Sequence, residues 1–382
     1  MRLLYLSSDP GIPVLGHKGA SVHVRQIATA LSHLGVEVAI ASPRTEPAGD
    51  TIETPIELLP LPETRPKASS EAEVCVAIEQ QRAAVLEAAR SFAADAIYER
   101  YSLFSDGGVR AAAVLGIPHV LEVNAPLREE AIRFRTLPHP DLALALERVV
   151  FRDTGRILAV SGEIKRWLVN EGVSPDRIDV VPNAVAPEMF GARPERRDDE
   201  FVLGFCGSLK AWHGIEVLLE ACAIAFPKEP SLYLEVIGDG PLASLLDSTP
   251  LPTSRLHRLG AIPHAAAVAR LRGWDVGIAP YLPIEGFYFS PLKVVEYMAA
   301  GICPVASDLG DLPALLDGGR GVLVPAGDPE QLAATFIELA RDRDRTAKLG
   351  QRARTYVLDR HTWTRNARVV LDSLAACREL AA

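Results

Sequence analysis

The stretch SPLKVVEYMAAG, residues 290–301, decides the fold of this chain. Its composition predicts a helix, because Ser290 is a favourable N-cap residue and Pro291 suits the first helical position. Gly301 suits the left-handed residue that ends a helix. A short apolar, strand-like run lies on either side. Strand, loop, helix and strand form a βαβ unit, and ligands bind parallel sheets at the carboxyl ends of the strands. We therefore expect a binding site where this helix begins.

The first turn of the predicted helix combines an anion site with a carboxylate. The free amides of Leu292 and Lys293 point out of the positive end of the helix dipole, and Lys293 adds a cation. Glu296 follows on the same side of the helix. This combination suits a nucleotide, with amides for the diphosphate and a carboxylate for the ribose hydroxyls. A capped surface helix in which Glu296 only pairs with Lys293 remains the alternative.

The length and charge of the chain restrict its class. The 382 residues predict two domains, and 48% hydrophobic with 23% charged residues is typical of a globular protein. The net charge of −9, without a basic stripe, argues against a nucleic-acid partner. The five cysteines form no C-x-x-C pair, so we expect neither disulfides nor zinc, and a reducing compartment. No metal site is expected, since the one D-x-D, residues 342–344, lies in a charged helical segment.

No segment approaches the ~18 uncharged apolar residues of a membrane span. The first apolar run is too short for a signal peptide and indicates a buried strand. We therefore expect a cytoplasmic protein, and peripheral contact with a membrane stays open.

Strand-like runs alternate with helical patterns along most of the chain, which predicts α/β domains with parallel sheets covered on both faces. We assign no element to residues 42–70, which are rich in Pro, Glu and Thr. The alternation stops at a Pro- and charge-rich linker near residue 190 and then restarts. The expected organisation is a Rossmann-like domain over 1–186, a second over 187–361, and a last helix, 362–382, that crosses back to the first.

Three glycine-containing loops follow predicted strands and supply further candidates. The first, GHKGAS at residues 16–21, could bring backbone close to a ligand, but it is neither a G-x-G-x-x-G nor a Walker motif. In the second, GSLKAWHG at 207–214, Lys210 could neutralise a phosphate, and His213 could donate to it or only fill the turn. The third, GDGP at 238–241, predicts a tight turn.

The ordered motifs GSLKxWHG, IGDGP, RLGAIPH, DVGIAPY and SPLKVVEYMAAG resemble family 4 of the GT-B glycosyltransferases (glycosyl transferases group 1) over the whole second domain. In the first domain, the loop after the first strand and VPNAV at 181–185 agree with the family. The resemblance implies two Rossmann-like domains facing a cleft. It also implies transfer of a sugar from a nucleoside diphosphate with retention of configuration, and no metal or other cofactor.

The resemblance also assigns roles to residues. Glu296 matches the second glutamate of the family's E-x7-E motif, which binds the ribose, whereas Tyr288 replaces the first. The family has an Arg and a Lys in the loop after the first strand of the second domain, and in this chain those positions hold Ser208 and His213. Its active-site histidine falls at Asn124, which can hydrogen-bond a hydroxyl but cannot act as a base. The expected donor-binding residues are Gly207, Ser208, Lys210, His213, Gly238, Gly260, Ile262, Tyr288, Ser290, Leu292, Lys293 and Glu296; the acceptor-binding residues are Gly16, His17, Lys18, Gly19 and Asn124; and the catalytic residues are Asn124, Lys210, Lys293 and Glu296.

The expected reaction is transfer of a sugar to a hydroxyl of a small-molecule, glycan or lipid-linked acceptor. The departing phosphate would take the proton of that hydroxyl, so no protein nucleophile is needed. Two alternatives stay open: a GT-B sugar-nucleotide epimerase, which needs no acceptor, and a non-catalytic subunit that binds nucleotide sugars.

Overall fold

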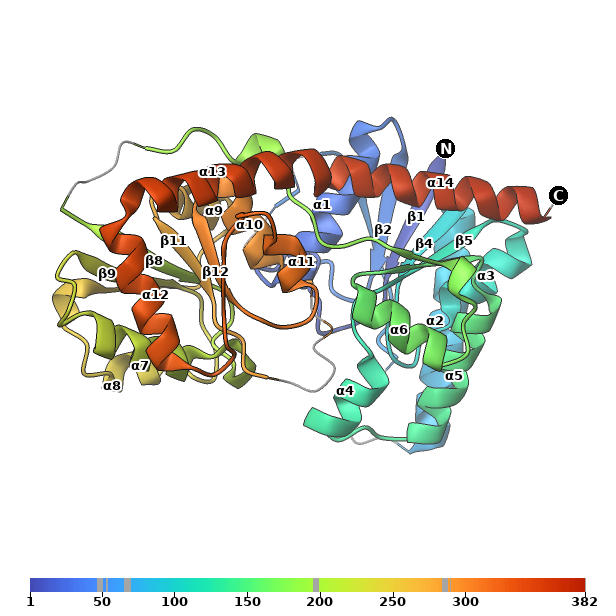
Figure 1. The fold of residues 1–382 in the computed structure, drawn as a ribbon. Coiled ribbons are helices and arrows are strands. Elements are labelled where there is room, and N and C mark those ends of the chain that lie inside the picture. Colours follow the sequence, from blue (N-terminus) through green and yellow to red (C-terminus); the bar gives the residue numbers. More distant parts are fainter. Residues whose placement is uncertain are drawn as a thin grey trace. The chain divides into compact units, whose positions relative to one another are not determined.

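The computed structural model describes residues 1–46, 51–52, 54–64, 70–194, 199–283, 288 and 290–381. The chain forms two compact units (Figure 1). The first unit comprises Met1–Pro182 together with Trp363–Ala382, and the second comprises Asn183–Thr362. Each unit is an α/β domain with its own parallel sheet, as the alternation of strands and helices predicts.

The first unit is built on a sheet that has seven parallel strands over the described residues, in the order β3-β2-β1-β4-β5-β6-β7. Their bounds are β1 (Arg2–Ser7), β2 (Glu37–Ser42), β3 (Glu57–Pro60), β4 (Ala96–Arg100), β5 (His119–Val123), β6 (Arg156–Ala159) and β7 (Ile178–Val180). The helices described in this unit are α1 (Gly19–His33), α2 (Glu71–Ser91), α3 (Gly107–Leu115), α4 (Leu127–Phe134), α5 (Pro140–Asp153), α6 (Gly162–Asn170) and α14 (Trp363–Ala381).

Strand β3 corrects the expectation that residues 42–70 hold no element. It pairs with β2 through Ala39↔Glu57 to Ser42↔Pro60 and forms one edge of the sheet. The segment has few apolar residues because an edge strand is half-exposed, and a proline is tolerated there since one side needs no hydrogen bonds.

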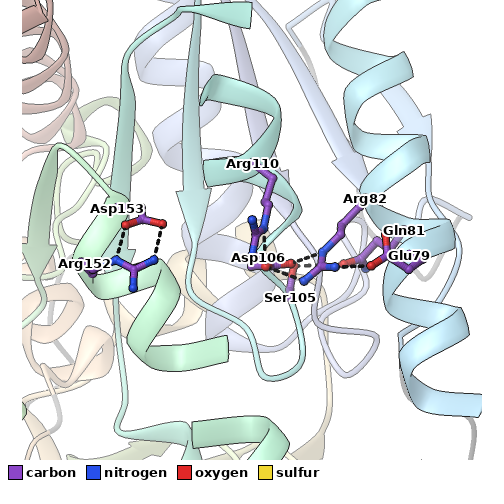
Figure 2. Close-up of polar contacts among 8 residues, drawn as sticks. All are labelled: Glu79, Gln81, Arg82, Ser105, Asp106, Arg110, Arg152 and Asp153. Carbon is purple, nitrogen blue, oxygen red and sulfur yellow. Dashed lines mark hydrogen bonds and ion pairs between the residues drawn. The ribbon is translucent and has the colours of Figure 1, made fainter. Parts of the chain in front are cut away.

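Helices α2 and α3 are joined by an ion cluster centred on the buried Asp106, which Figure 2 shows. The Asp106 carboxylate is inaccessible to solvent and accepts from Arg82 Nε at 2.6 Å, from Arg82 Nη2 at 2.7 Å and from Arg110 Nε at 2.9 Å. Ser105 donates to Gln81 at 3.0 Å beside it. The aspartate precedes α3 but does not cap it, because both of its oxygens are already occupied by guanidinium groups.

The second unit contains a six-stranded parallel sheet, counted over the described residues, in the order β10-β9-β8-β11-β12-β13. The strands are β8 (Phe201–Cys206), β9 (Leu232–Ile237), β10 (Leu256–Gly260), β11 (Val276–Ala279), β12 (Cys303–Ser307) and β13 (Val322–Val324). The α-helices described are α7 (Ile215–Ala225), α8 (Leu245–Ser248), α9 (His264–Leu271), α10 (Leu292–Ala300), α11 (Leu312–Leu316), α12 (Pro329–Arg341) and α13 (Arg343–Arg360). The strand order reverses between β8 and β11, and a crevice opens at the carboxyl ends of such a pair.

Two paired glycines bring α10 close to this sheet. Gly204 of β8 and Gly277 of β11 are register partners on neighbouring strands. A Cβ atom on Gly204 would lie 1.9 Å from the Trp274 ring, and one on Gly277 would lie 2.3 Å from the Tyr297 ring. The Tyr297 hydroxyl accepts from the Cys206 N–H at 2.9 Å, which ties α10 to the end of β8. Gly277 thus lets Tyr297 of α10 pack directly on the sheet, and Gly204 does the same for Trp274.

Candidate functional site

Loops that follow β8 and β9 form a floor of backbone at the carboxyl edge of the second sheet. The Gly207 N–H donates to the Ile237 carbonyl at 2.9 Å, and the Gly238 N–H donates to the Gly260 carbonyl at 2.8 Å. A Cβ atom on Gly238, which has φ +134°, would lie 1.9 Å from the Gly207 carbonyl oxygen. The structure thus brings together three of the predicted donor-binding glycines, Gly207, Gly238 and Gly260.

Lys293 lies against this floor with its amine buried. Its Nζ atom is inaccessible to solvent and makes no hydrogen bond to any residue that the structure describes. The amine sits 4.2 Å from the centre of the Phe205 ring and 5.2 Å from that of Tyr281, where cation–π attraction partly compensates its charge. Burial lowers the pKa of Lys293 to about 7, against a smaller opposing effect of Cys206 and Glu296. Within the part of the chain that the structure describes, the amine is thus buried without a hydrogen-bond acceptor.

His213 faces the same region as a neutral imidazole. Its Nδ1 donates to the Ser208 carbonyl oxygen, and its ring packs edge-on against Tyr281, with 5.5 Å between the ring centres. Burial, and then the nearby Lys293 charge, lower the pKa of His213 to about 3. With Nδ1 as the donor, the Nε2 of the neutral ring carries no proton in the free protein, and donation from His213 to a phosphate stays a prediction. Lys210, by contrast, extends over the Trp212 ring at 4.7 Å.

Glu296 lies in the second turn of α10 and is 7% exposed. Its Oε1 accepts from His264 Nε2 at 2.6 Å, so it does not form the surface pair with Lys293 that was the alternative reading of this helix. His264 is the first residue of α9 and lies two residues after Ile262, one of the predicted donor-binding residues. Ile262 is half-buried against the core cluster that includes α10. The predicted residues Ile262 and Glu296 thus both lie next to the packed pair of helices α9 and α10.

The start of α10 differs from its prediction. Ser290 was expected to cap the helix, but the N-cap is Pro291, with an extended backbone and no side-chain cap, and the helix begins at Leu292. The Ser290 hydroxyl instead accepts from the Asn183 N–H at 2.9 Å, and the Asn183 side chain donates to the Ser290 carbonyl at 2.6 Å. The amides of the first turn stay uncapped by any side chain. Gly301 ends the helix with φ +71°, as predicted.

Tyr288 is described and half-buried, whereas residues 284–287 and 289 lie outside the described residues. For metal ions, no cluster of three His, Cys, Asp or Glu side chains in the described ranges could hold one. In the D-x-D segment, Asp342 and Asp344 are exposed, and Asp342 caps α13 by accepting from the Arg345 N–H at 3.0 Å.

The acceptor candidates belong to the first unit and begin at the loop before α1. The buried Arg25 guanidinium donates to the carbonyls of Val14 and Gly16, both at 2.7 Å, and this fixes the turn. Lys18 precedes α1 and donates from Nζ to the Gly11 carbonyl at 3.0 Å. His17, Lys18 and Gly19 are exposed, so this loop presents side chains and backbone to solvent.

Asn124 directly follows β5 and rests on a buried carboxylate. Its Nδ2 donates to Glu122 Oε1, which leaves its carbonyl oxygen for another group. Glu122 also accepts from His23 Nε2 at 2.9 Å, from Arg100 Nη1 at 2.5 Å and from the Tyr98 hydroxyl. Burial alone would raise the pKa of Glu122, but the His23 and Arg100 charges hold it well below its usual value. The site therefore offers a neutral amide supported by a permanent anion.

The sequence interpretation missed three residues that shape these sites: Arg25, Glu122 and His264. Glu122 carried a signal, because a carboxylate inside an otherwise apolar strand needs buried partners. His264 was part of the RLGAIPH motif but was given no role. Arg25 lies in a helical pattern where a charge looks like an ordinary surface residue.

Known proteins resemble the chain over both units. Residues 17–189 match the family described as Glycosyltransferase Family 4, and residues 200–342 match Glycosyl transferases group 1. The phosphatidyl-myo-inositol mannosyltransferase of Mycolicibacterium smegmatis is 31% identical over 267 residues, which are 64% of this chain and 67% of that protein.

Solved structures agree on the fold. The sucrose-phosphate synthase of Thermosynechococcus elongatus has a TM-score of 0.76 at 19% identity, covering 100% of both chains. The Anabaena protein HepE, solved in complex with UDP, has a TM-score of 0.71 at 17% identity, covering 98% of this chain and 100% of that one. No helix in the described part of the chain has the length and hydropathy to cross a membrane. The resemblance found in the loop motifs is confirmed: the chain belongs to glycosyltransferase family 4, the glycosyl transferases group 1, and its two units have the Rossmann-like α/β fold of GT-B enzymes.

Proposed function

We propose that this glycosyltransferase takes its sugar from a nucleoside-diphosphate sugar and transfers it with retention of configuration, without a metal ion. The observation that carries the proposal is the buried Lys293 amine, which has no hydrogen-bond partner among the described residues. A buried cation without a partner is unfavourable, and an unpaired buried group in a crevice is typical of a functional site. A diphosphate would supply the missing charge.

The neighbours of Lys293 fit such a donor. The amides of Leu292 and Lys293 begin a helix whose first turn has no side-chain cap, so both can donate to phosphate oxygens. Because Gly207 and Gly238 have no side chains, the two loops pack against each other and against the Lys293 side chain, which places their backbone beside the proposed diphosphate. Glu296 lies in the same helix, within reach of a ribose bound beside the diphosphate. The UDP complex of the structural neighbour HepE makes UDP the first nucleotide to test.

In the proposed reaction, the bond between the anomeric carbon and the β-phosphate oxygen breaks while the acceptor oxygen bonds to the anomeric carbon from the same face. The proton of the acceptor hydroxyl passes to the departing phosphate. Negative charge grows on the β-phosphate during this step, and Lys293 with the α10 amides stabilises it. Loss of one such donor raises a barrier by about 2.7–4 kcal/mol.

For the acceptor, we propose a hydroxyl compound that the first unit binds at its loop before α1 and at Asn124. Small molecules, glycans and lipid-linked sugars all present such hydroxyls, and the name of the mycobacterial relative favours testing a lipid-linked polyol. The protein would act in the cytoplasm, where nucleotide sugars are made, with peripheral membrane contact if its acceptor is a lipid.

The test is binding followed by product analysis. Thermal-shift measurements with UDP, GDP, ADP and dTDP should identify one nucleotide, because a ligand at 100 times its Kd stabilises by about 2.7 kcal/mol. NMR of the product made from the matching sugar nucleotide should then show the anomeric configuration of the donor. An inverted product would overturn retention, and conversion of the sugar without any acceptor would identify an epimerase. Absence of binding by all four nucleotides would refute the proposed donor.

A further inference from the structure

The contact between His264 and Glu296 joins two helices that meet beside the proposed donor site. His264 begins α9, and Glu296 lies in α10, 32 residues further along the chain. The next turn of α9 places Ala267 and Val268 in the same buried cluster as Val295 and Tyr297, the neighbours of Glu296. Both side chains are therefore mounted on packed helices, and their contact does not depend on the loops between them.

The contact leaves the carboxylate half-occupied. A carboxylate only accepts, so His264 must donate its Nε2 proton to Glu296 Oε1, at 2.6 Å. Oε2 makes no hydrogen bond to any described residue and, unlike the Lys293 amine, is not sealed from solvent. The carboxyl group is thus held through one oxygen, and the other oxygen has no partner among the described residues.

We propose that His264 is a positioning residue for the ribose of the donor: it fixes Glu296 so that Oε2 accepts the hydrogen bonds of the ribose hydroxyls. This inference rests on the proposed nucleotide-sugar donor. A buried carboxylate with no partner would rotate or take up a proton before the nucleotide arrives, and either change would spoil an acceptor for two hydroxyls. In the free protein, His264 gives Oε1 of Glu296 a hydrogen-bond donor and leaves Oε2 available for the ribose hydroxyls.

The opposite role predicts an opposite result. If His264 only occupied Glu296 in the free protein and had to be displaced, removal of His264 would tighten nucleotide binding. If His264 positions Glu296, its removal weakens nucleotide binding, and the loss is confined to the part of the affinity that comes from the ribose. The sign of the change therefore separates the two roles.

The experiment is calorimetry on the full chain with UDP, 2′-deoxy-UDP, 3′-deoxy-UDP and inorganic pyrophosphate, or with the corresponding GDP or ADP set if that base binds. A hydrogen bond to a carboxylate is worth roughly tenfold or more in Kd, so the wild type should lose about that factor for each hydroxyl that Glu296 binds. In His264→Ala, this deoxy penalty should shrink to less than about 3-fold, while the Kd for pyrophosphate changes less than about 2-fold.

Two further variants complete the test. His264→Gln keeps a donor close to the position of Nε2 and should recover most of the deoxy penalty. His257→Ala is the matched control, because His257 is an exposed histidine of the same unit whose ring packs near Tyr233. An unchanged deoxy penalty in His264→Ala, or tighter binding of UDP by that variant, would overturn the role of His264 but not the proposed donor. The same holds if the wild type binds UDP and both deoxy analogues equally well. If no nucleoside diphosphate binds, the proposed donor itself fails.

Discussion

Each unit contains a buried ionisable side chain near the carboxyl edge of its sheet, Glu122 in the first and Lys293 in the second, and the two differ in how far their hydrogen bonds are satisfied. In the first unit, Glu122 accepts from five donors, which belong to Tyr5, His23, Tyr98, Arg100 and Asn124. In the second unit, the amine of Lys293 faces the Phe205 and Tyr281 rings and has no hydrogen-bond partner among the described residues. The carboxylate of the first unit holds Asn124 in place, whereas we propose that the amine of the second unit binds a ligand.

This difference indicates in which unit a group that is unfavourable for folding is kept for function. A buried anion with complete partners costs little as long as none of them is removed. A buried amine without a partner destabilises the free protein, and that cost is recovered only when an anion binds. We therefore expect substitutions of Glu122 and its partners to lower the free energy of unfolding, and substitution of Lys293 to lower the rate of sugar transfer.

The largest effect should come from Glu122→Gln. Removing the negative charge leaves Arg100 and His23 buried without compensation, and breaking such a group typically costs about 3–5 kcal/mol of unfolding free energy. Urea unfolding followed by fluorescence would measure the loss. Because the pKa of Glu122 lies below its unfolded value, this stability is present above the ordinary glutamate range and is lost as the pH falls through and below it.

Glu99→Gln is the matched control for that variant. Glu99 lies on β4, next to β5, and its Oε2 is 2.9 Å from Nε2 of His119. The register of β4 and β5 places Glu99 on the face of the sheet opposite to Glu122. Burial raises the pKa of Glu99, so its charge contributes less and its loss should cost less. If the two variants lost equal amounts of unfolding free energy, the charge of Glu122 would not contribute more to stability than that of Glu99.

Next in size is the loss of activity in Lys293→Met. Removal of the cation that stabilises the leaving phosphate should slow release of the nucleoside diphosphate from the donor about 100- to 1,000-fold. The unfolding free energy should stay the same or rise, because a buried amine is replaced by an apolar chain of similar length. Lys228→Met, at an exposed lysine of the same unit, is the control. Turnover at the wild-type rate would remove Lys293 from the mechanism.

The smallest effect is a dependence of nucleotide affinity on pH. Since burial lowers the pKa of Lys293 to about 7, most molecules of the free protein carry a neutral amine above that pH. Binding a diphosphate then requires uptake of a proton, so the Kd for UDP, or for whichever nucleotide binds, should rise by up to about tenfold per pH unit between pH 7.5 and 9. Calorimetry at several pH values would measure it. The Lys293→Met variant should show a flat profile, and a flat profile in the wild type would refute the assignment.

The sequence predicted the elements of this fold best where local pattern dominates. Strands β8 and β9 are mostly apolar runs, which is the pattern of buried parallel strands and is visible in the sequence alone. Strand β3 was missed because its identity depends on pairing with β2, which its composition does not reveal. The helix at Ser290 was predicted, but its cap was wrong, since the Ser290 hydroxyl bonds Asn183, 107 residues away.

The same limit applies to the sites. Glycine loops and the SPLK motif marked the donor region, because those residue types act through backbone and charge in any surrounding. The burial of Lys293, the tautomer of His213 and the partner of Glu296 depend on side chains from other strands and helices. No spacing rule contains that information, so the roles of His264 and Glu122 required the structure.

The last helix, α14, has a consequence for how the chain is made. It packs on α1, β5 and β6 of the first unit, and buries Ala367, Val370 and Leu374. The whole second unit is translated between the body of the first unit and this helix. At ~5–20 residues per second, a ribosome leaves the apolar surface that α14 covers bare for roughly 10–40 s. The body of the first unit is thus made before the second unit, and the surface that α14 covers is protected only after the second unit has been made.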